Sequence, residues 1–350
     1  MKSSIPENDT KKSTIKDINP KIIVDNFGRV HNYLRISLTE KCNLRCFYCM
    51  PEEGNVLSEK STIVNHLEVL QLAKKFVELG VTKIRLTGGE PLIKKNFDLI
   101  IRGLSQLPVA LGITTNGIVL DKYLELFTEC GVNNLNISLD TLKKEKFNNI
   151  TRRDYFDRVM NNIIIAEQKG FNVKLNAVLI KGENDDELID FIEFTKYKNV
   201  SFRFIEFMPF DGNKWDTSKV VALQEVLEKI NNHYTPSQLI KLVDKKNDTN
   251  KNYQIKGYKG SFGVISTVSN PFCDGCNRIR LTANGKIKNC LFSTSETDLL
   301  TPLRNGEDLT PYILSAISNK KQVRGGMKSQ EDFLDNEKNT QNRSMINIGG

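Results

Sequence analysis

Short apolar runs rich in β-branched residues alternate with longer amphipathic stretches along this chain, starting near residue 33. The amphipathic stretches often end at a glycine, as at Gly80, Gly131 and Gly170, and a new apolar run follows. These runs predict strands over residues 34–39, 81–87, 111–115, 135–140, 173–179 and 202–207. Because strands that alternate with helices pair in parallel through right-handed crossovers, the sequence predicts an α/β fold.

The stretch before the second predicted strand carries the clearest helix signals. Asn65 stands before its apolar period and Glu68 follows three residues later, which is the pattern of a capping box. Gly80 provides the expected helix stop. We expect the buried face of this helix to consist of Leu67, Leu70, Phe76 and Val77.

Several predicted strands have one apolar and one polar face at a period of two, as with Leu34 and Ile36 against Arg35 and Ser37. Strands of a parallel sheet covered on both faces are normally apolar throughout, so a polar face indicates contact with water or a polar ligand. In a barrel this face is the lumen, and its cationic members here are Arg35, Lys83, Arg85 and Lys174. Such a lumen suits a phosphorylated ligand. We therefore expect a partial (β/α)6 TIM-like barrel; a doubly wound open sheet and an antiparallel sheet with one wet face are the competing folds.

The pattern changes after about residue 245. Residues 245–251 are charged and asparagine-rich, which indicates a linker. Strand-like segments follow over 262–268, 279–283 and 287–291, and Asn284-Gly285 between the last two predicts a type I′ hairpin turn. A further helix is expected near residues 311–319. We expect a polar tail over 1–25, a barrel over 26–250, and a C-terminal region over 251–350 that closes the open side of the barrel.

Composition narrows the class of protein. The chain is 39% hydrophobic and 26% charged, which is ordinary for a globular protein. No apolar run approaches the roughly 20 residues of a membrane span, and the first 25 residues lack the apolar core of a secretory signal. We expect a soluble protein in a reducing compartment, with no membrane partner. The net charge of +8 indicates an anionic partner, unless it belongs to a lysine-rich surface that only aids solubility.

The chain has seven cysteines, an odd number that argues against a disulfide framework in a chain of this size. Cys42, Cys46 and Cys49 form a C-x3-C-x2-C group after the first predicted strand. Three thiolates can hold three irons of a 4Fe–4S cube and leave the fourth iron open. A structural zinc site would need a fourth ligand, and no Cys or His follows nearby. Cys130 lies at helical spacing from Phe127, and we interpret it as a core residue.

Cys273, Cys276 and Cys290 form a second group with the spacing C-x2-C-x13-C. On its own, this spacing is most often that of a zinc site. Like the first group, however, it provides only three ligands, which favours a second iron–sulfur cluster with an open iron as the competing interpretation. Arg278 and Arg280 alternate on the strand between these cysteines. Two guanidinium groups beside an open iron suit an anionic nucleotide, whereas a solvated strand face is the structural alternative.

The first cysteine loop resembles that of radical S-adenosylmethionine (SAM) enzymes, and Gly88-Gly89-Glu90-Pro91 resembles their second motif. The resemblance implies that SAM binds the open iron and is cleaved reductively to a 5′-deoxyadenosyl radical. It also implies which residues contact SAM: Tyr48, Gly89, Glu90, Ser138 and Met208.

From about Asn26 to its last residue, the chain further resembles the GTP 3′,8-cyclase family, also called molybdenum cofactor biosynthesis protein A. The resemblance rests on the second cysteine group with its Arg278 and Arg280, on residues 204–209 and on the terminal Gly349-Gly350; residues 208–215 are similar to eukaryotic members. It implies two 4Fe–4S clusters and conversion of GTP to 3′,8-cyclo-7,8-dihydro-GTP, the first step of molybdenum cofactor synthesis.

By this resemblance Arg35, Arg278 and Arg280 are catalytic, and the terminal glycines reach the active site. The GTP-binding residues would be Arg35, Lys83, Arg85, Thr114, Lys174, Arg278 and Arg280. The implied partners are an electron donor for the first cluster, a downstream pterin-forming enzyme and a second copy of the chain. The implied compartment is the mitochondrial matrix if the protein is eukaryotic, and otherwise the cytoplasm.

Two other functions compete. A radical SAM enzyme with an auxiliary cluster could act on a peptide, although such modules usually carry more cysteines than the second group offers. A zinc-stapled nucleic-acid-binding protein could use both groups and the basic excess. Nucleic acid is not expected as a partner, because few aromatic residues lie near the basic ones to stack with bases.

Overall fold

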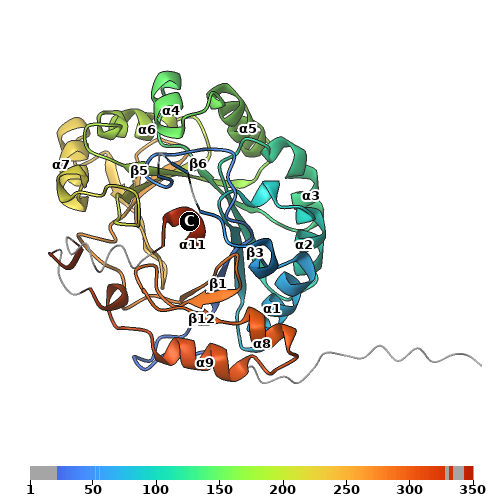
Figure 1. Ribbon diagram of the computed structural model, residues 1–350. Helices are drawn as coiled ribbons and strands as arrows, with labels where there is room; N and C mark the ends of the chain where they lie inside the picture. The colour runs from blue at the N-terminus through green and yellow to red at the C-terminus, as the bar shows by residue number, and fades with distance from the viewer. Residues whose placement is uncertain (1–21, 52, 55, 328–330, 334–342, 350) are drawn as a thin grey trace, which may run out of the picture.

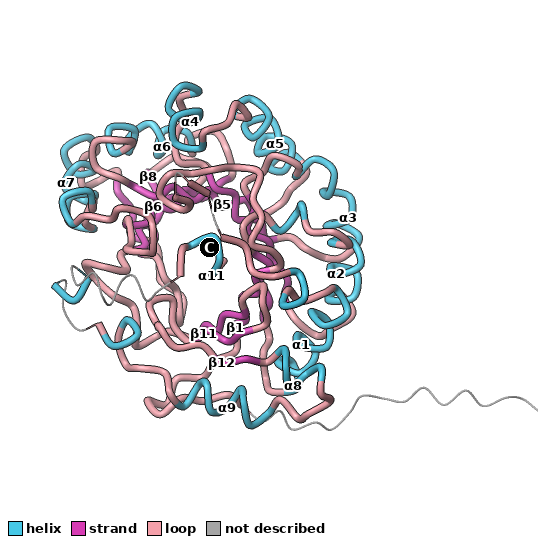
Figure 2. The backbone as a smooth tube through the Cα atoms, viewed as in Figure 1, coloured by secondary structure: helices cyan, strands magenta, loops and turns pink. Residues whose placement is uncertain are grey.

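In the computed structural model, strands surround a central space and the larger helices lie outside them (Figures 1 and 2). The structure describes residues 22–51, 53–54, 56–327, 331–333 and 343–349. The first six strands are β1 (Tyr33–Ser37), β2 (Lys83–Thr87), β3 (Ala110–Thr115), β4 (Asn134–Ser138), β5 (Asn172–Leu179) and β6 (Val200–Glu206). The helices that follow them are α1 (His66–Glu78), α2 (Phe97–Leu104), α3 (Leu124–Glu129), α4 (Lys144–Thr151), α5 (Phe156–Gln168), α6 (Leu188–Phe194) and α7 (Leu223–His233).

All neighbouring pairs from β1 to β6 are parallel, which confirms the partial (β/α)6 barrel and excludes the antiparallel alternative. The sheet continues at both ends through β7 (Leu239–Lys241), β8 (Lys251–Ile255), β9 (Ser261–Ile265), β10 (Arg278–Leu281), β11 (Lys286–Lys288) and β12 (Thr297–Asp298). Its strand order is β12-β11-β10-β1-β2-β3-β4-β5-β6-β9-β8-β7. The C-terminal region therefore extends the barrel wall on both sides, with β10 parallel to β1 and β9 parallel to β6.

Helix α1 tests the helix prediction in detail. Asn65 caps it, and the reciprocal capping box with Glu68 is present. The predicted buried face was partly correct: Phe76 is buried and Leu70 and Val77 pack half-buried against the core, whereas Leu67 is 60% exposed. The buried residues Val69, Leu72 and Ala73 were not predicted. The capping box depends on residues within one helical turn, whereas the buried face of the helix depends on the core residues of the barrel against which it packs.

The C-terminal region differs from the prediction in its turns. The supposed linker connects two short strands, β7 and β8, which pair in antiparallel fashion. The expected type I′ turn was also wrong: Gly285 N donates to Thr282 O and Thr282 N donates to Lys286 O, both at 2.9 Å. Of Asn284 and Gly285, only Gly285 has a positive φ, 72°. The loop is thus one residue longer than a type I′ hairpin loop.

The remaining helices are α8 (Leu300–Arg304), α9 (Thr310–Ser318), which matches the predicted C-terminal helix, and α11 (Met345–Ile348). Helix α11 lies inside the ring of strands (Figures 1 and 2).

Within the predicted polar tail, Ile23 and Asp25 are buried whereas Ile22 and Val24 are exposed, and the extent of the tail stays a prediction. Ile23 is 1% exposed, and Asp25 is buried beside Arg29. Residues 1–21 lie outside the described part of the chain. The division into domains at residue 250 stays a prediction, and one sheet runs across it.

Candidate active site

The first cysteine group occupies the loop after β1. Leu44 N lies 3.4 Å from the Cys42 sulfur, and a turn closes from Cys49 N to Cys46 O at 3.0 Å. Burial raises the pKa of the Cys49 thiol to about 12, with the charge of Cys42 adding to the effect, and Cys46 likewise interacts with both other cysteines. The three sulfurs therefore share one environment, and a metal would have to displace their protons on binding.

The Gly88–Pro91 motif is clamped against the base of this loop. Gly89 N donates to Thr39 O at 2.7 Å, and Glu90 N donates to Lys41 O at 2.8 Å. A Cβ atom on Gly89 would lie 2.3 Å from Lys41 O, so only glycine permits this approach.

Glu90 is fully buried at the end of β2. Its carboxylate accepts hydrogen bonds from Leu92 N at 3.0 Å, Thr115 Oγ1 at 2.8 Å and Asn116 N at 2.7 Å. These bonds tie the ends of β2 and β3 together and use three of the roughly four acceptor positions of a carboxylate. Burial raises the pKa of Glu90 to about 7, against the opposing effect of these donors.

Tyr48 fixes the far side of the cysteine loop. Its hydroxyl donates to Asp140 Oδ2 at 2.6 Å, and Asp140 Oδ1 accepts from Val178 N at 2.8 Å. Burial raises the pKa of Asp140 to about 6, although both hydrogen bonds oppose the shift.

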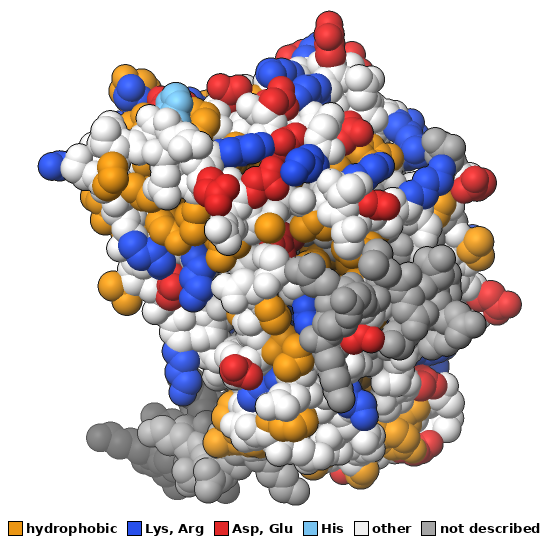
Figure 3. Space-filling model, turned by 90° about the vertical axis from the view of Figure 1, so that its left-hand side faces the viewer, with side chains coloured by type: hydrophobic (Ala, Val, Ile, Leu, Met, Phe, Trp, Pro, Cys, Tyr) orange, Lys and Arg blue, Asp and Glu red, His pale blue; other side chains and the backbone are white. Residues whose placement is uncertain are grey.

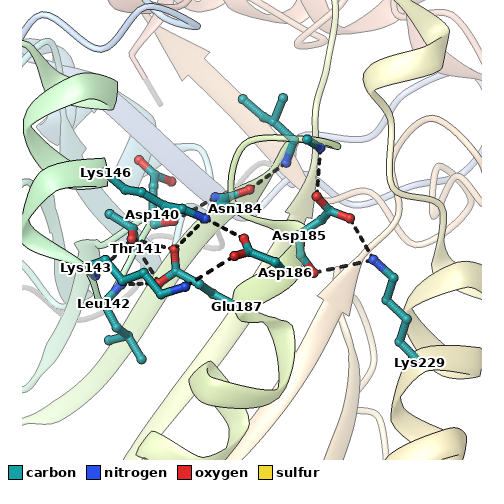
Figure 4. Close-up of polar contacts among 12 residues, drawn as sticks. Asp140, Thr141, Leu142, Lys143, Lys146, Asn184, Asp185, Asp186, Glu187 and Lys229 are labelled. Carbon is teal, nitrogen blue, oxygen red and sulfur yellow. Dashed lines mark hydrogen bonds and ion pairs between the residues drawn. The ribbon is translucent and has the colours of Figure 1, made fainter.

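A network of hydrogen bonds between the loops after β4 and β5 holds Asp140 in place (Figure 4). Asn184 Nδ2 donates to Asp140 O at 2.7 Å and to Val178 O at 2.9 Å. Glu187, which is fully buried, accepts from Thr141 Oγ1 at 2.7 Å and from Leu142 N at 2.8 Å. The loops after β4 and β5 are thereby held together, and Asp140 connects them with Tyr48 of the cysteine loop.

The other two predicted SAM contacts also lie at the carboxyl ends of strands. Ser138 is the last residue of β4 and is partly buried. Met208 follows β6 and packs in a small apolar cluster with Phe210 and Phe292. Active sites of (β/α) barrels are built at this end of the strands.

The second cysteine group lies beside β10. Lys320 Nζ is 3.4 Å from the Cys276 sulfur, and Arg324 N is 3.4 Å from the Cys273 sulfur. Although burial opposes it, the charges of Arg278 and Lys320 lower the pKa of Cys276 to about 6. Cys273 interacts with both Cys276 and Cys290, so these three thiols also share one environment.

The predicted cationic lumen is present. Arg35 stands level with Arg85 on β2 and with Arg280 on β10, and Lys83 and Arg278 flank Tyr33 in the next row. Burial and the charges of Arg280, Arg85 and Arg278 lower the pKa of Arg35 to about 9. Mutual repulsion of this kind is costly unless an anion relieves it.

Arg203 on β6 belongs to this set, and the sequence analysis missed it. Burial and the charge of Arg85 lower its pKa to about 10, and its own charge helps burial to lower the pKa of Lys174 to about 8. Alternation between Phe202 and Phe204 was the available signal. A pocket of about 440 Å³, lined by Lys174, Arg203 and Asp248 among others, opens beside them.

Tyr33 was also missed. Arg85 Nε donates to its hydroxyl at 2.8 Å. Burial opposes its ionisation, but Arg85, Arg35 and Lys83 lower the pKa of this phenol to about 7. Thr114, by contrast, was predicted, and it stands level with Asn136 on the same polar face.

Gly349 lies against the same polar face of the barrel. A Cβ atom on Gly349 would lie 2.6 Å from Thr87 Oγ1 and 2.8 Å from Ser37 Cβ. Ser37 and Thr87 continue the alternating face that carries Arg35 and Arg85. Gly349 thus lies against this face, Gly350 lies outside the described residues, and the expectation that the tail reaches the active site stays a prediction.

Both thiol groups suit iron–sulfur clusters by their donor chemistry, since each offers three sulfurs in one environment with hydrogen-bond donors directed at them. Within the described ranges, no three Cys, His, Asp or Glu side chains are grouped so as to hold a single metal ion.

The described part of the chain also contains no helix long and apolar enough to cross a membrane. The face shown in Figure 3 carries basic and acidic side chains interspersed.

The fold and the first cysteine loop define a radical SAM enzyme. Residues 36–195 match the family model of the Radical SAM superfamily, and residues 200–325 match that of Molybdenum Cofactor Synthesis C. The structure of Streptococcus suis SuiB bound to S-adenosylmethionine superposes with a TM-score of 0.57 at 17% identity, covering 84% of this chain and 70% of that one.

The chain belongs to the GTP 3′,8-cyclase family. It is 49% identical to the mitochondrial GTP 3′,8-cyclase of Arabidopsis thaliana, covering 94% of this chain and 84% of that one. It is 41% identical to the GTP 3′,8-cyclase of Listeria monocytogenes, covering 94% and 99%. Human molybdenum cofactor biosynthesis protein 1 is 45% identical over 88% of this chain, which spans 49% of the human protein. The family uses SAM and two 4Fe–4S clusters.

Proposed function

We propose that this protein converts GTP to 3′,8-cyclo-7,8-dihydro-GTP in the first step of molybdenum cofactor synthesis, with the nucleotide held in the lumen between the two thiol groups. The observation that carries this proposal is the cationic face, whose members interact from Lys174 on β5 round to Arg280 on β10. A triphosphate relieves the repulsion among these groups, whereas a peptide without clustered acidic side chains does not.

The cofactors perform the difficult chemistry. When bound, SAM and the first cluster would supply radical chemistry at C3′ of GTP, and the second cluster would supply an open iron for the guanine base. We assign the first cluster to Cys42, Cys46 and Cys49, and the second to Cys273, Cys276 and Cys290.

The protein residues orient the reactants and shield them. Gly89 and Glu90 would receive the methionine part of SAM, and Tyr48, Ser138 and Met208 would contact the rest of the molecule. Lys83, Arg85, Thr114, Lys174 and Arg203 bind the triphosphate and ribose by charge and hydrogen bonding. Arg35, Arg278 and Arg280 stand between the two thiol groups and stabilise negative charge on the reacting nucleotide.

The tail contributes by excluding water. Gly349 fills space against Ser37 and Thr87 that a larger residue could not enter. A closed lumen protects a carbon-centred radical from side reactions and keeps the two reacting atoms in contact.

The proposal also covers partners and location. An electron donor must reach the first cluster, and a pterin-forming enzyme must consume the product. A second copy of the chain is a further expected partner. The name of the plant relative supports the mitochondrial matrix as the compartment of eukaryotic members.

The deciding experiment is anaerobic reconstitution with iron and sulfide, followed by incubation with SAM, dithionite and GTP. We expect a new compound of the mass of GTP, formed together with 5′-deoxyadenosine. Deoxyadenosine without a change in GTP would refute the substrate and favour the peptide alternative. Protein that holds both clusters and forms neither compound would refute the enzyme assignment of these sites.

A further inference from the structure

One short segment contacts Cys273, Cys276 and the residues that follow Cys290. This segment follows α9 and consists of residues 320–325; we call it the wrap. Lys320 Nζ approaches the Cys276 sulfur at 3.4 Å and donates to Arg278 O at 3.2 Å. At the other end, Arg324 N approaches the Cys273 sulfur at 3.4 Å.

The third contact of the wrap is made by Gly325. A Cβ atom there would lie 2.8 Å from Phe292 C and Ser293 N, two and three residues after Cys290. Arg324 and Gly325 have φ values of 41° and 69°, an unusual conformation for the arginine. The wrap therefore keeps a strained backbone in order to lie close to the cysteine loops.

Arg29 clamps the wrap to the cysteine loop from a distant part of the chain. Its Nη1 donates to Cys273 O at 3.0 Å and to Gln322 O at 2.7 Å, and its Nη2 donates to Lys321 O at 3.0 Å. Asp25 Oδ2 accepts from Arg29 Nε at 2.6 Å, so the guanidinium is held on every side. A planar group with five donors is suited to join three carbonyl oxygens in fixed geometry.

Lys320 is an unusual lysine. It is 4% exposed, and an ammonium group that far from water requires strong partners. The partners that the structure gives it are a carbonyl oxygen and a cysteine sulfur that we assign to a cluster. Hydrogen bonds and positive charge at cluster thiolates stabilise the reduced state of an iron–sulfur cluster.

We propose that Lys320 is a positioning residue for the second cluster, which orients the Cys276 thiolate and raises the reduction potential of the cluster, and that Arg29 keeps the wrap in place for this task. This inference rests on the proposed ligation of the second cluster by Cys273, Cys276 and Cys290. It assigns a role to two cations that the proposed function does not otherwise use.

The test compares Lys320→Met with Lys321→Met in the full-length reconstituted protein. Lys321 is exposed, so its variant is a matched control for loss of one adjacent charge. Reduction potentials are measured by redox titration followed by electron paramagnetic resonance. The signal of the second cluster is assigned in the full chain that also carries Cys42→Ser, Cys46→Ser and Cys49→Ser.

We expect Lys320→Met to shift the potential of the second cluster to a more negative value and to release its iron faster to a chelator, while the first cluster and Lys321→Met are unchanged. Arg29→Lys keeps the charge but cannot join three carbonyl groups, so we expect faster iron release with a smaller shift in potential.

Two results would overturn the inference in different ways. If wild-type protein holds iron and sulfide for one cluster alone, the proposed ligation fails and the inference fails with it. If both clusters are present but Lys320→Met behaves like Lys321→Met, the role of Lys320 is refuted and the proposed function stands. Thermal unfolding of each variant shows whether any effect reflects general loss of the fold.

Discussion

The hydroxyl of Tyr48 and the carboxylate of Asp140 are joined by a 2.6 Å hydrogen bond, although 92 residues separate them in sequence. Tyr48 belongs to the first cysteine loop, and Asp140 belongs to the loop after β4. Through this bond, the network around Asn184 and Glu187 supports the loop that we assign to the first cluster (Figure 4).

Tyr48→Phe is expected to weaken SAM binding without preventing folding. The variant leaves buried Asp140 with one donor fewer, and the cysteine loop loses its anchor to β4. We expect the dissociation constant of SAM to rise roughly tenfold, or about 1.4 kcal/mol, measured by equilibrium dialysis with reconstituted protein. Tyr312→Phe, which removes an exposed hydroxyl–carboxylate bond to Glu307, is the control. Equal affinities in the two variants would contradict the role of the bond.

Arg203→Met should weaken binding of GTP far more than binding of guanosine. Arg203 lines the cationic pocket and interacts with Arg85, so its partner is expected to be a phosphate group. A charge-assisted hydrogen bond contributes about 1.5–3 kcal/mol, so the GTP affinity should fall roughly 10- to 100-fold. Binding is followed by calorimetry.

The control for this change is Arg102→Met, which removes an exposed arginine paired with Glu129. If Arg203→Met lowers the affinities of GTP and guanosine equally, Arg203 supports the general structure of the site and not the phosphates.

Binding of GTP should depend on pH through Lys174. Burial, with the charges of Arg203, Arg85 and Lys83, lowers the pKa of this lysine from 10.5 to about 8. In the free protein its charge is therefore lost as pH rises through about 8, while a bound triphosphate raises its pKa again. We expect weaker GTP binding above about pH 8, with proton uptake on binding, detected by calorimetry in buffers of different ionisation enthalpy. Lys174→Arg keeps its charge and should flatten this dependence; an unchanged profile would exclude Lys174 as its source.

Gly349→Ala should displace the tail from the lumen. Its Cβ atom would meet Thr87 and Ser37 below 3 Å, at a φ of 85°. Gly170→Ala is a matched control, because Gly170 has a φ of 82° and nothing within 4 Å of the added atom. We expect Gly349→Ala alone to reduce product formation at least tenfold and to speed tryptic cleavage after Arg343. The control should show a loss of stability of about 1 kcal/mol and nothing else. Equal behaviour would show that the tail is not needed in the lumen.

The sequence was sufficient for those features that repeat or lie close together along the chain. The period-two alternation around Arg35 predicted a polar lumen, and the structure confirms its cationic members. The capping box at Asn65 was correct because its bonds are made within one turn of helix.

Features that depend on distant parts of the chain were not predicted. The orientation of α1 depends on the barrel behind it, so Leu67 was placed on the wrong face. Arg29 and Lys320 meet the second cysteine group only after folding, and no local pattern connects them with it. Arg203 is different, since its alternation with Phe202 and Phe204 was visible and was overlooked.

The parallel pairing of β1 with β10 affects how the chain can reach its native state. Tyr33 stands level with Arg278, so the wall of the barrel beside β1 cannot form until nearly 250 further residues have been synthesised. Contacts of such long sequence separation are formed slowly, and an unpaired strand edge is open to association with other chains in the meantime. The nascent protein should therefore need protection at the exposed edge of β1, even though the β1–β6 part of the sheet can already assemble in order.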